Sequence, residues 1–297
     1  MSAAGRRVLS SATRWKIRSA RFLAQSAVPR PLRSQAVHLS YYNGRNFGDQ
    51  LSPRVVEFVL GAPVVEAHFA GADLSAIGSI LDPLERWRNP YNPVVWGSGF
   101  LREGGRWRGR DIRPVAVRGT LSRERVAHLA DSAVALGDPA LLVRRMYPQL
   151  MAIPKRYLVS LVPHISEAWH DDVARARADV PGLHVIDVRA DPRRVLEEIA
   201  ASEIVLSSSL HGLICADALD VPNRWVPISG DLGGGDYKFA DYYSVFGQQP
   251  EPLHLAEALD AAPALAAAWT PRQGLDAILD ALIASFPAED LAALYRR

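Results

Sequence analysis

Short apolar runs recur along this chain, and the segments between them carry helical periodicity. Strands buried on both faces of a parallel sheet have this appearance, because helices cover both faces and no residue needs to face water. The runs lie at residues 36–42, 64–65, 76–80, 94–96, 114–117, 133–136, 157–162, 184–188, 204–206 and 224–228. Helical patterns lie at residues 52–60, 167–179, 192–201 and 212–219. The alternation predicts an α/β fold with parallel sheets.

A proline-bearing segment at residues 147–155 divides the apolar runs into two sets of similar length. We therefore predict two Rossmann-like β/α/β domains, residues 36–150 and 155–250, that face each other across a cleft. The 297 residues are enough for two such domains. An alanine-rich helical segment, residues 251–297, is expected to pack on the outside of this body.

Composition excludes several classes of protein. The hydrophobic fraction of 48% and the charged fraction of 22% are those of a globular chain. The single cysteine, Cys215, rules out an internal disulfide framework and a cysteine-ligated metal cluster, and it fits a reducing compartment. No apolar run is long enough to predict a membrane span, and no segment has the form of a signal peptide. We therefore expect the body of the protein in the cytoplasm.

The first 35 residues form a basic leader. Residues 1–48 contain nine arginine or lysine residues and no aspartate or glutamate. Because the basic excess lies in this tail and not on a folded face, we expect no nucleic-acid partner. Apolar residues such as Trp15 and Phe22 fall on one side of an imperfect amphipathic helix. The leader is interpreted either as a peripheral contact with an anionic membrane surface, or as a loosely ordered or body-packed extension.

Polar and glycine-containing loops follow most of the predicted strands. In open parallel sheets, ligands bind beyond the carboxyl ends of the strands, where these loops and the helix N-termini meet. Small residues let the backbone approach a ligand there, and free N–H groups at a helix start attract an anion. The candidate binding residues in these loops are Asn46, Gly48, Gly97, Ser98, Arg118, His164, Ser207, Ser209 and Lys238. The chain contains no dinucleotide fingerprint and no P-loop motif.

The most informative loop is Ser207-Ser208-Ser209-Leu210-His211-Gly212. It places three hydroxyl groups at a predicted helix N-terminus and follows them with an imidazole. A cationic histidine is disfavoured at this end of a helix, so protonated His211 would need a bound anion such as a phosphate or a carboxylate. The alternative interpretation is a capping serine followed by a histidine packed between the domains.

Short motifs at these strand ends resemble those of one known family. They are NFGD at 46–49, WGSG at 96–99, VRG at 117–119, GDPA at 137–140, PH at 163–164, and SLHG at 209–212 with ADAL at 216–219. The chain is similar, over about residues 38–247, to the polysaccharide pyruvyl transferases, nearer to the bacterial exopolysaccharide branch. The resemblance implies a glycosyltransferase-B-like pair of Rossmann-type domains. It also implies transfer of pyruvate from phosphoenolpyruvate to a sugar as a ketal, with no cofactor besides this donor.

One departure from the family's pattern concerns the negative charges of the donor. Many members have Ser-x-Arg-Leu-His where this chain has Ser207-Ser208-Ser209-Leu210-His211, so Ser209 takes the place of an arginine. The candidates for a replacing cation are Arg118, Arg123, His164 and Lys238. Arg118 is the first choice, because a guanidinium can hold a carboxylate through two hydrogen bonds, whereas a lysine acts as a point charge for phosphate.

Catalytic roles follow from the chemistry that the resemblance implies. The methylene carbon of phosphoenolpyruvate must be protonated, and C2 must be attacked by a sugar hydroxyl. A histidine beside the phosphate is the expected proton donor, and His211 fits best. Asp49 is the candidate base for the hydroxyl, with a helix-capping aspartate as the alternative. No metal is required, and no set of potential ligands has convincing spacing. Trp96 could offer a face to a sugar ring.

Two other functions stay open on the sequence alone. A nucleotide-sugar-dependent glycosyltransferase can share this architecture, because a fold does not determine its donor. Such an enzyme needs a carboxylate in the second domain to hold a ribose, and Asp217 is the acid nearest to the serine-rich loop. The third function is a non-catalytic module that binds an anionic glycan or a membrane, which should lack a cleft histidine with cationic neighbours.

Deletion of residues 1–35 tests the role of the leader. As a surface anchor it would bring the body to lipid-linked sugar acceptors, and each basic residue near an anionic surface contributes about 1 kcal/mol. The full-length protein should therefore sediment with anionic vesicles at low salt, and the shortened protein should stay in the supernatant. Failure of the full-length protein to sediment would contradict an anchor.

Overall fold

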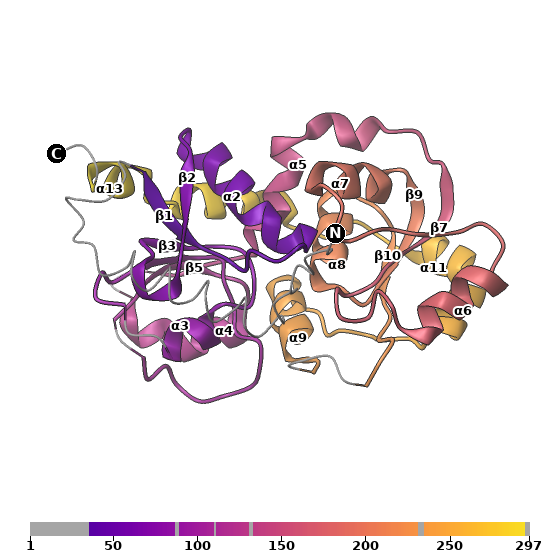
Figure 1. Cartoon of the computed structure of the whole chain (residues 1–297), viewed down its shortest axis with the longest axis horizontal. Helices are drawn as coiled ribbons and strands as arrows, with labels where there is room; N and C mark the ends of the chain where they lie inside the picture. The colour runs from indigo at the N-terminus through magenta and orange to yellow at the C-terminus, as the bar shows by residue number, and fades with distance from the viewer. Residues whose placement is uncertain (1–35, 87–88, 110, 131–132, 231–234, 295–297) are drawn as a thin grey trace, which may run out of the picture.

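The structure is a computed structural model that describes residues 36–86, 89–109, 111–130, 133–230 and 235–294. The predicted leader lies outside these residues. The described residues form a six-stranded sheet in the order β2-β1-β3-β4-β5-β6 and a four-stranded sheet in the order β10-β9-β7-β8. All paired strands are parallel, which confirms the predicted α/β class. The sheets form the centres of an N-terminal lobe and a C-terminal lobe that lie side by side (Figure 1).

The N-terminal lobe is built on six short strands. These are β1 (Val37–Ser40), β2 (Val64–Ala67), β3 (Leu74–Ser75), β4 (Val94–Trp96), β5 (Arg113–Val117) and β6 (Ala135–Leu136). The helices of this part of the chain are α2 (Phe47–Leu60), η2 (Phe69–Gly71), α3 (Leu81–Arg86), α4 (Thr120–Val126), η3 (Ala127–Leu129), η4 (Pro139–Leu142), α5 (Val143–Met146) and η5 (Pro148–Ala152). Every residue of β4 is buried, as expected of a strand whose two faces are both covered.

The C-terminal lobe repeats the alternation around four strands. These are β7 (Tyr157–Val162), β8 (Leu183–Val185), β9 (Ser202–Ser207) and β10 (Asn223–Trp225). The helices that follow or separate them are α6 (Asp171–Asp179), α7 (Pro192–Ala200), α8 (Leu210–Ala218), α9 (Tyr237–Tyr243), η6 (Ser244–Phe246), α10 (Leu255–Asp260) and α11 (Ala262–Ala268). Helix α8 is buried along its whole length, because η4 of the N-terminal lobe packs on it.

Three boundaries differ from the prediction in ways that matter for the site. Residues 76–80 form a buried loop after β3 and not a strand, and Gly78 leaves the extended conformation with a φ of 109°. Helix α2 begins at Phe47, so Asp49 lies in its first turn and not in a loop. Helix α8 begins at Leu210, which places His211 in the first turn of that helix.

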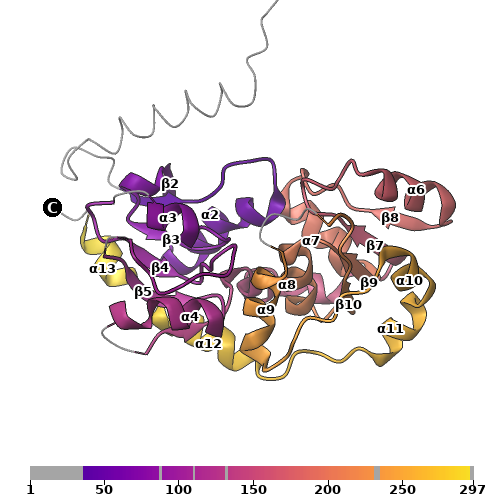
Figure 2. The same cartoon turned by 90° about the horizontal axis from the view of Figure 1, so that it is seen from below.

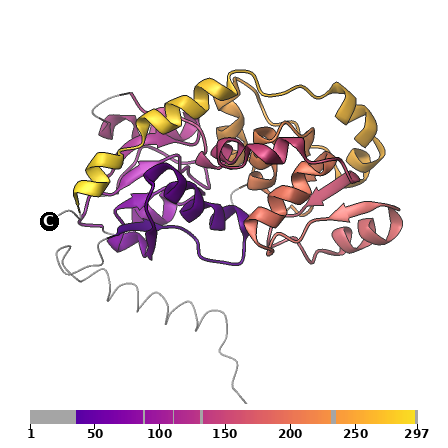
Figure 3. The same cartoon turned by 90° about the horizontal axis from the view of Figure 1, so that it is seen from above.

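The C-terminal segment crosses from one lobe to the other. Helices α10 and α11 pack on the C-terminal lobe, whereas α12 (Leu275–Ser285) and α13 (Ala288–Ala293) lie along the N-terminal lobe (Figure 2). In Figure 3 these last helices form a yellow band along the N-terminal lobe. The Trp96 indole donates to the carbonyl of Leu282 at 2.9 Å and packs edge-on against Phe286. Trp96 is therefore wholly buried and offers no face to a sugar, contrary to the suggestion from the sequence.

Helix α9 is fixed to the C-terminal lobe by aromatic side chains. Phe239 stacks on Trp225 of β10 with ring centroids 4.2 Å apart. The hydroxyl of Tyr242 donates to Asp217 of α8 at 2.8 Å. The remaining side of α9 is free to contact the other lobe.

A buried ion pair on that side of α9 joins the two lobes. Arg118, which follows β5, places Nη2 at 2.9 Å and Nε at 3.0 Å from Oδ2 of Asp241, and both side chains are 0% exposed. The main-chain N–H and the hydroxyl of Ser122 also donate to Asp241. A Cβ at Gly119 would approach the carbonyl oxygen of Asp241 to 1.7 Å, so only glycine permits this contact.

Replacing Asp241 by alanine should strongly destabilise the fold, because the Arg118 guanidinium would stay buried without its counter-ion. We expect the free energy of unfolding to fall by about 3–5 kcal/mol in urea titrations. Asp290→Ala is the matched control. Its pair with Arg113 is exposed (62% and 39% of the two side chains), so the loss should stay below about 1 kcal/mol. Equal urea midpoints for the two variants would show that the buried pair does not join the lobes.

Candidate active site

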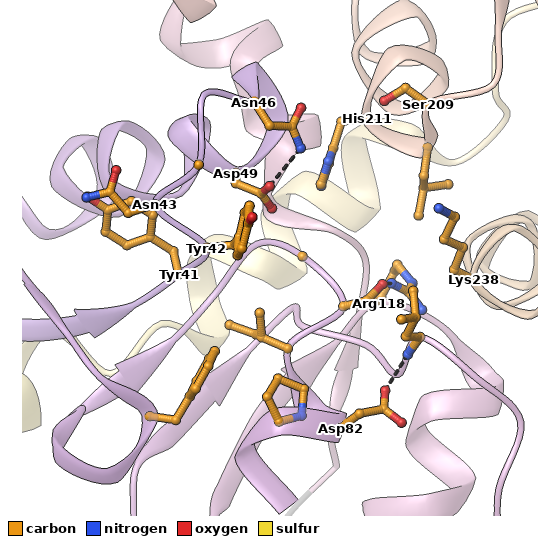
Figure 4. Close-up of a pocket in the computed structure, with 18 of the residues that line it drawn as sticks. Tyr41, Tyr42, Asn43, Asn46, Asp49, Asp82, Arg118, Ser209, His211 and Lys238 are labelled. Atoms are coloured by element: carbon orange, nitrogen blue, oxygen red, sulfur yellow. Dashed lines mark hydrogen bonds between the residues drawn. The ribbon is translucent and has the colours of Figure 1, made fainter. Parts of the chain in front are cut away.

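A cavity of about 1370 Å³ lies beyond the carboxyl ends of the strands, with residues of both lobes in its walls. The N-terminal lobe contributes the loops after β1 and β3 and the start of α2. The C-terminal lobe contributes the loop after β7, the start of α8 and Lys238 of α9. Figure 4 shows Asp49, Arg118, His211 and Lys238 around a common space. This is the place where parallel sheets bind ligands.

The structure divides the residues proposed from the sequence into two groups. Those that line the cavity are Asn46, Asp49, Arg118, His164, Ser209, His211 and Lys238. Those outside its walls are Gly48, Gly97, Ser98, Arg123 and Ser207.

The polar residues of the second group have other contacts. The hydroxyls of Ser98 and Ser207 are wholly buried and donate to main-chain carbonyls, of Ala76 and Val162 respectively. They hold strand ends to their loops and are not available to a substrate. Arg123 is exposed on α4. None of these three residues lines the cavity, so the structure gives no support for their expected binding roles.

Gly48 and Gly97 serve packing and not ligand approach. A Cβ at position 48 would come within 2.1 Å of Nδ1 of His211, so the absent side chain makes room for the imidazole. Gly97 has a φ of 86°, and a Cβ there would approach Pro139 to 2.1 Å. Both glycines therefore let neighbouring side chains pack closely, and neither of them lines the cavity.

From the sequence we expected Arg118 to hold a carboxylate through two hydrogen bonds. The residue lines the cavity, but its contacts within the protein leave it unable to do so. Asp241 occupies Nε and one side of Nη2. Nη2 also donates to the carbonyl of Phe100 at 2.6 Å, and Nη1 donates to Ser79 at 2.8 Å. A guanidinium has five N–H groups, so Nη1 alone keeps one for a ligand. Arg118 thus contributes positive charge and one hydrogen bond.

The two histidines of the cavity are uncharged in the absence of a ligand. Burial lowers the pKa of His211 to about 3, and the positive charges of Arg118 and Lys238 act in the same direction. Burial also lowers the pKa of His164 to about 4, again with a contribution from Lys238. An anion bound beside these rings would oppose the cations and favour protonation.

Lys238 is a cation that the cavity can offer to a ligand. In the part of the chain that the structure describes, its Nζ forms no hydrogen bond or ion pair, and it lies 5.1 Å from the ring of Phe239. The side chain is only 5% exposed. Burial lowers its pKa to about 8, with the charge of Arg118 as a further cause. The ammonium is therefore still mostly charged at neutral pH but poorly hydrated, which suits contact with a phosphate.

Asp49 and Asn46 lie together at the start of α2. Asn46 is the N-cap residue, but its side chain donates to Oδ2 of Asp49 at 2.7 Å and does not cap the helix. Asp49 is consequently not the capping residue that we considered as the alternative. Burial raises the pKa of Asp49 to about 7. A carboxyl group that ionises near neutrality can accept a proton from a hydroxyl.

Two features of the cavity were not predicted from the sequence. Tyr41, Tyr42 and Phe69 line its N-terminal side. Tyr41 and Tyr42 end the predicted strand at residues 36–42, and Phe69 lies shortly after β2, which was the available signal. Asp138 lies behind the imidazole of His211, with Oδ2 at 4.0 Å from Nε2. Its signal was its place in a glycine-containing loop after a strand, although no local pattern indicates that it contacts His211.

Two further kinds of site are absent from the described ranges. No three His, Cys, Asp or Glu side chains there lie close enough to hold a metal ion together. No helix within these ranges combines the length and apolar character needed to cross a membrane.

The fold and the cavity define a two-lobed α/β protein with a cationic pocket lined by both lobes. The family model described as polysaccharide pyruvyl transferase matches residues 46–230, which include residues on both sides of the pocket. The chain belongs to the polysaccharide pyruvyl transferase family, as the resemblance of its motifs indicated.

Two relatives extend this comparison. The chain is 30% identical over 217 residues to the succinoglycan biosynthesis protein ExoV of Rhizobium meliloti (strain 1021), which covers 70% of this chain and 63% of the relative. It is 28% identical over 210 residues to the uncharacterized protein L143 of Acanthamoeba polyphaga mimivirus, covering 68% of this chain and 71% of the relative. The match thus spans less than two thirds of the length of ExoV.

The raised pKa of Asp49 predicts a pH-dependent gain in stability on its neutralisation. The folded protein binds a proton at Asp49 up to about pH 7, whereas the unfolded chain releases it near pH 3.8. The ionised form therefore costs stability, and this cost grows between these two pH values. Asp49→Asn should raise the free energy of unfolding by on the order of 1–4 kcal/mol at pH 8 and have little effect at pH 4.

Asp191→Asn provides a control of opposite sign. The hydrogen bond from Arg54 lowers the pKa of Asp191, so its ionised form stabilises the fold and its loss should destabilise the protein at pH 8. Urea unfolding at both pH values measures the two changes. A lower free energy of unfolding for Asp49→Asn at pH 8 would show that the ionised carboxylate of Asp49 does not destabilise the fold.

Proposed function

We propose that this protein is a transferase that moves pyruvate from phosphoenolpyruvate to a sugar of an exopolysaccharide or lipid-linked glycan, as a ketal. The observation that carries the proposal is the meeting, in one cavity of a member of this family, of an unpaired buried ammonium, an uncharged imidazole and a carboxyl group with a pKa near 7. The proposed arrangement of the lobes is glycosyltransferase-B-like.

The donor's two anionic groups have separate partners in this proposal. Its phosphate contacts Lys238 and the first N–H groups of α8, which have no acceptor within the helix. Its carboxylate takes the remaining N–H of Arg118 and the side chain of His164. Ser209, the N-cap residue of α8, lines the cavity and forms no capping hydrogen bond, so its hydroxyl is available to the donor.

The reaction begins with proton transfer to the donor. The negative charges of bound phosphoenolpyruvate raise the pKa of His211, and the imidazolium gives its proton to the methylene carbon, which becomes a methyl group. A sugar hydroxyl attacks C2 and loses its proton to Asp49. The bond between C2 and the phosphate oxygen then breaks, and phosphate leaves with the electron pair. A second hydroxyl of the same sugar attacks C2 and closes the ketal, and its proton leaves with the phosphate.

The acceptor sugar lies on the N-terminal side of the cavity in this arrangement. Tyr41, Tyr42 and Phe69 supply flat apolar surfaces there, as sugar rings require, and Asp49 lies between this side and His211. The name of the relative ExoV, a succinoglycan biosynthesis protein, supports an exopolysaccharide as the acceptor class. A cytoplasmic enzyme held peripherally at the membrane by its leader would meet a lipid-linked acceptor.

A nucleotide-sugar donor is less well supported. Asp217, the carboxylate considered for a ribose, is wholly buried and accepts hydrogen bonds from Asn223, Tyr242 and Arg272. It does not line the cavity. A non-catalytic glycan module would not need His211, Lys238 and an elevated pKa at Asp49 in one place.

Thermal unfolding with added ligands tests the donor. Phosphoenolpyruvate should raise the Tm in proportion to ln(1 + [L]/Kd), and nucleotide sugars should not. Lys238→Gln should lose most of this ligand-induced shift, because the phosphate loses its cation. Arg123→Gln removes an equal charge outside the cavity and should keep the shift. A Tm raised by a nucleotide sugar, with no response to millimolar phosphoenolpyruvate, would favour the glycosyltransferase instead.

A further inference from the structure

Two buried polar atoms at the rear of the His211 site have no hydrogen-bond partner among the described residues. They are Nε2 of His211 and Oδ2 of Asp138, and the distance between them is 4.0 Å. A buried polar atom without a partner costs free energy, so such pairs are rare in folded proteins. Two of them facing each other at a ligand cavity indicate that they form a hydrogen bond with each other once the ring moves slightly closer.

Asp138 is held rigidly in its place. It follows β6 and caps η4, where its Oδ1 accepts from the N–H of Ala140 at 2.9 Å. Pro139 fixes the backbone after it. The carboxyl group is 0% exposed, and it cannot turn away from His211 without losing the cap. Oδ2 is therefore directed permanently at the imidazole.

The imidazole is confined on its other side. Nδ1 of His211 lies beside Gly48, where a Cβ would come within 2.1 Å of it. The ring lines the cavity while Nε2 is buried against Asp138. Nδ1, unlike Nε2, is not among the buried side-chain atoms of the described residues that lack a partner, so it is the nitrogen left to meet a ligand.

We propose that Asp138 is the positioning residue of His211, accepting the Nε2–H of the imidazole and so fixing the tautomer that leaves Nδ1 for the donor. A hydrogen bond needs a separation of about 3 Å, so the ring moves toward Asp138 by about 1 Å when the bond forms. That Nδ1 then carries the transferred proton rests on the proposed function. The tautomer itself does not.

The charges around His211 explain why it needs this partner. Arg118, Lys238 and His164 face the ring from just beyond the end of β5, from α9 and from the loop after β7. They disfavour an imidazolium, because the charge of Arg118, like that of Lys238, opposes a further cation. Asp138 faces it from the loop after β6 with a carboxyl group whose pKa burial raises to about 6, so it is ionised at pH 7.5. A carboxylate behind the ring and a bound anion in front of it together stabilise the charged form.

Nitrogen-15 NMR of the histidine side chains tests the proposal directly. In the ligand-free wild-type protein at pH 7.5, His211 should carry its proton on Nε2. In Asp138→Asn the amide oxygen can keep the cap on Ala140, and its NH₂ group then faces the ring, so the proton should move to Nδ1. Asp138→Ser keeps a capping hydroxyl but has no second oxygen, and it should lose the preference for Nε2.

Two controls separate positioning from folding. Asp217→Asn neutralises another wholly buried aspartate outside the cavity and should leave the tautomer of His211 unchanged. Urea midpoints of all variants establish that the compared proteins are folded. The same His211 tautomer in the wild-type and Asp138→Asn proteins would overturn the positioning role.

Phosphate release from phosphoenolpyruvate in the presence of glycan acceptor gives a second readout. Asp138→Asn should lower kcat at least about tenfold with little change in KM, and it should have no further effect in a His211→Ala protein, because the two residues act as a unit. Additive losses would overturn the role. A tautomer that shifts as expected in a protein without phosphoenolpyruvate-dependent phosphate release would support Asp138 and contradict the proposed donor.

Discussion

The buried contact between Arg118 and Asp241 fixes how the rest of this structure is arranged. Both side chains are removed from water, so the desolvation of two charges is offset only when the two lobes are docked with their hydrogen bonds complete. Asp241 lies one helical turn after Lys238 on α9. The contact that docks the lobes therefore also sets where the cavity's ammonium group lies. The cavity is shaped before any ligand arrives, which reduces the ordering that binding would otherwise require.

The cavity contains more positive than negative charge, and burial together with this excess keeps its histidines neutral. Arg118 and Lys238 oppose charge on His211, whereas Asp49 holds a proton up to about pH 7. The protonation of the site thus depends on its occupant. A bound anion supplies the negative charge that stabilises the imidazolium, so anion binding and proton uptake at the imidazole are linked. Binding of a phosphate ester would therefore also favour protonation of the imidazole that donates the proton in the proposed reaction.

Much of the fold and of the cavity could be predicted from the apolar runs and the loops that follow them. Hydrophobic periodicity and turn residues are local properties of the sequence, so they can be recognised without the structure. These features placed Asn46, Asp49, His164 and His211 together from distant parts of the chain. Local patterns do not show which partner a polar side chain will find. The carboxylate that occupies Arg118 lies on a helix far along the chain, and α12 covers Trp96 from still farther away. Ser98, Ser207 and the two glycines do lie at or after strand ends, but they hold or fit the loops themselves, and Arg123 lies exposed on α4, which the local pattern does not show.

The crossing of the C-terminal helices has a consequence for how the two lobes fold. Helix α12 covers Trp96 on the N-terminal lobe, although the whole C-terminal lobe lies between them in the sequence. The N-terminal lobe therefore keeps part of its apolar surface uncovered until a segment from beyond the C-terminal lobe packs on it. A chain cut before α12 would expose that surface to other chains or to chaperones. The N-terminal lobe thus cannot complete its core as a separate fragment.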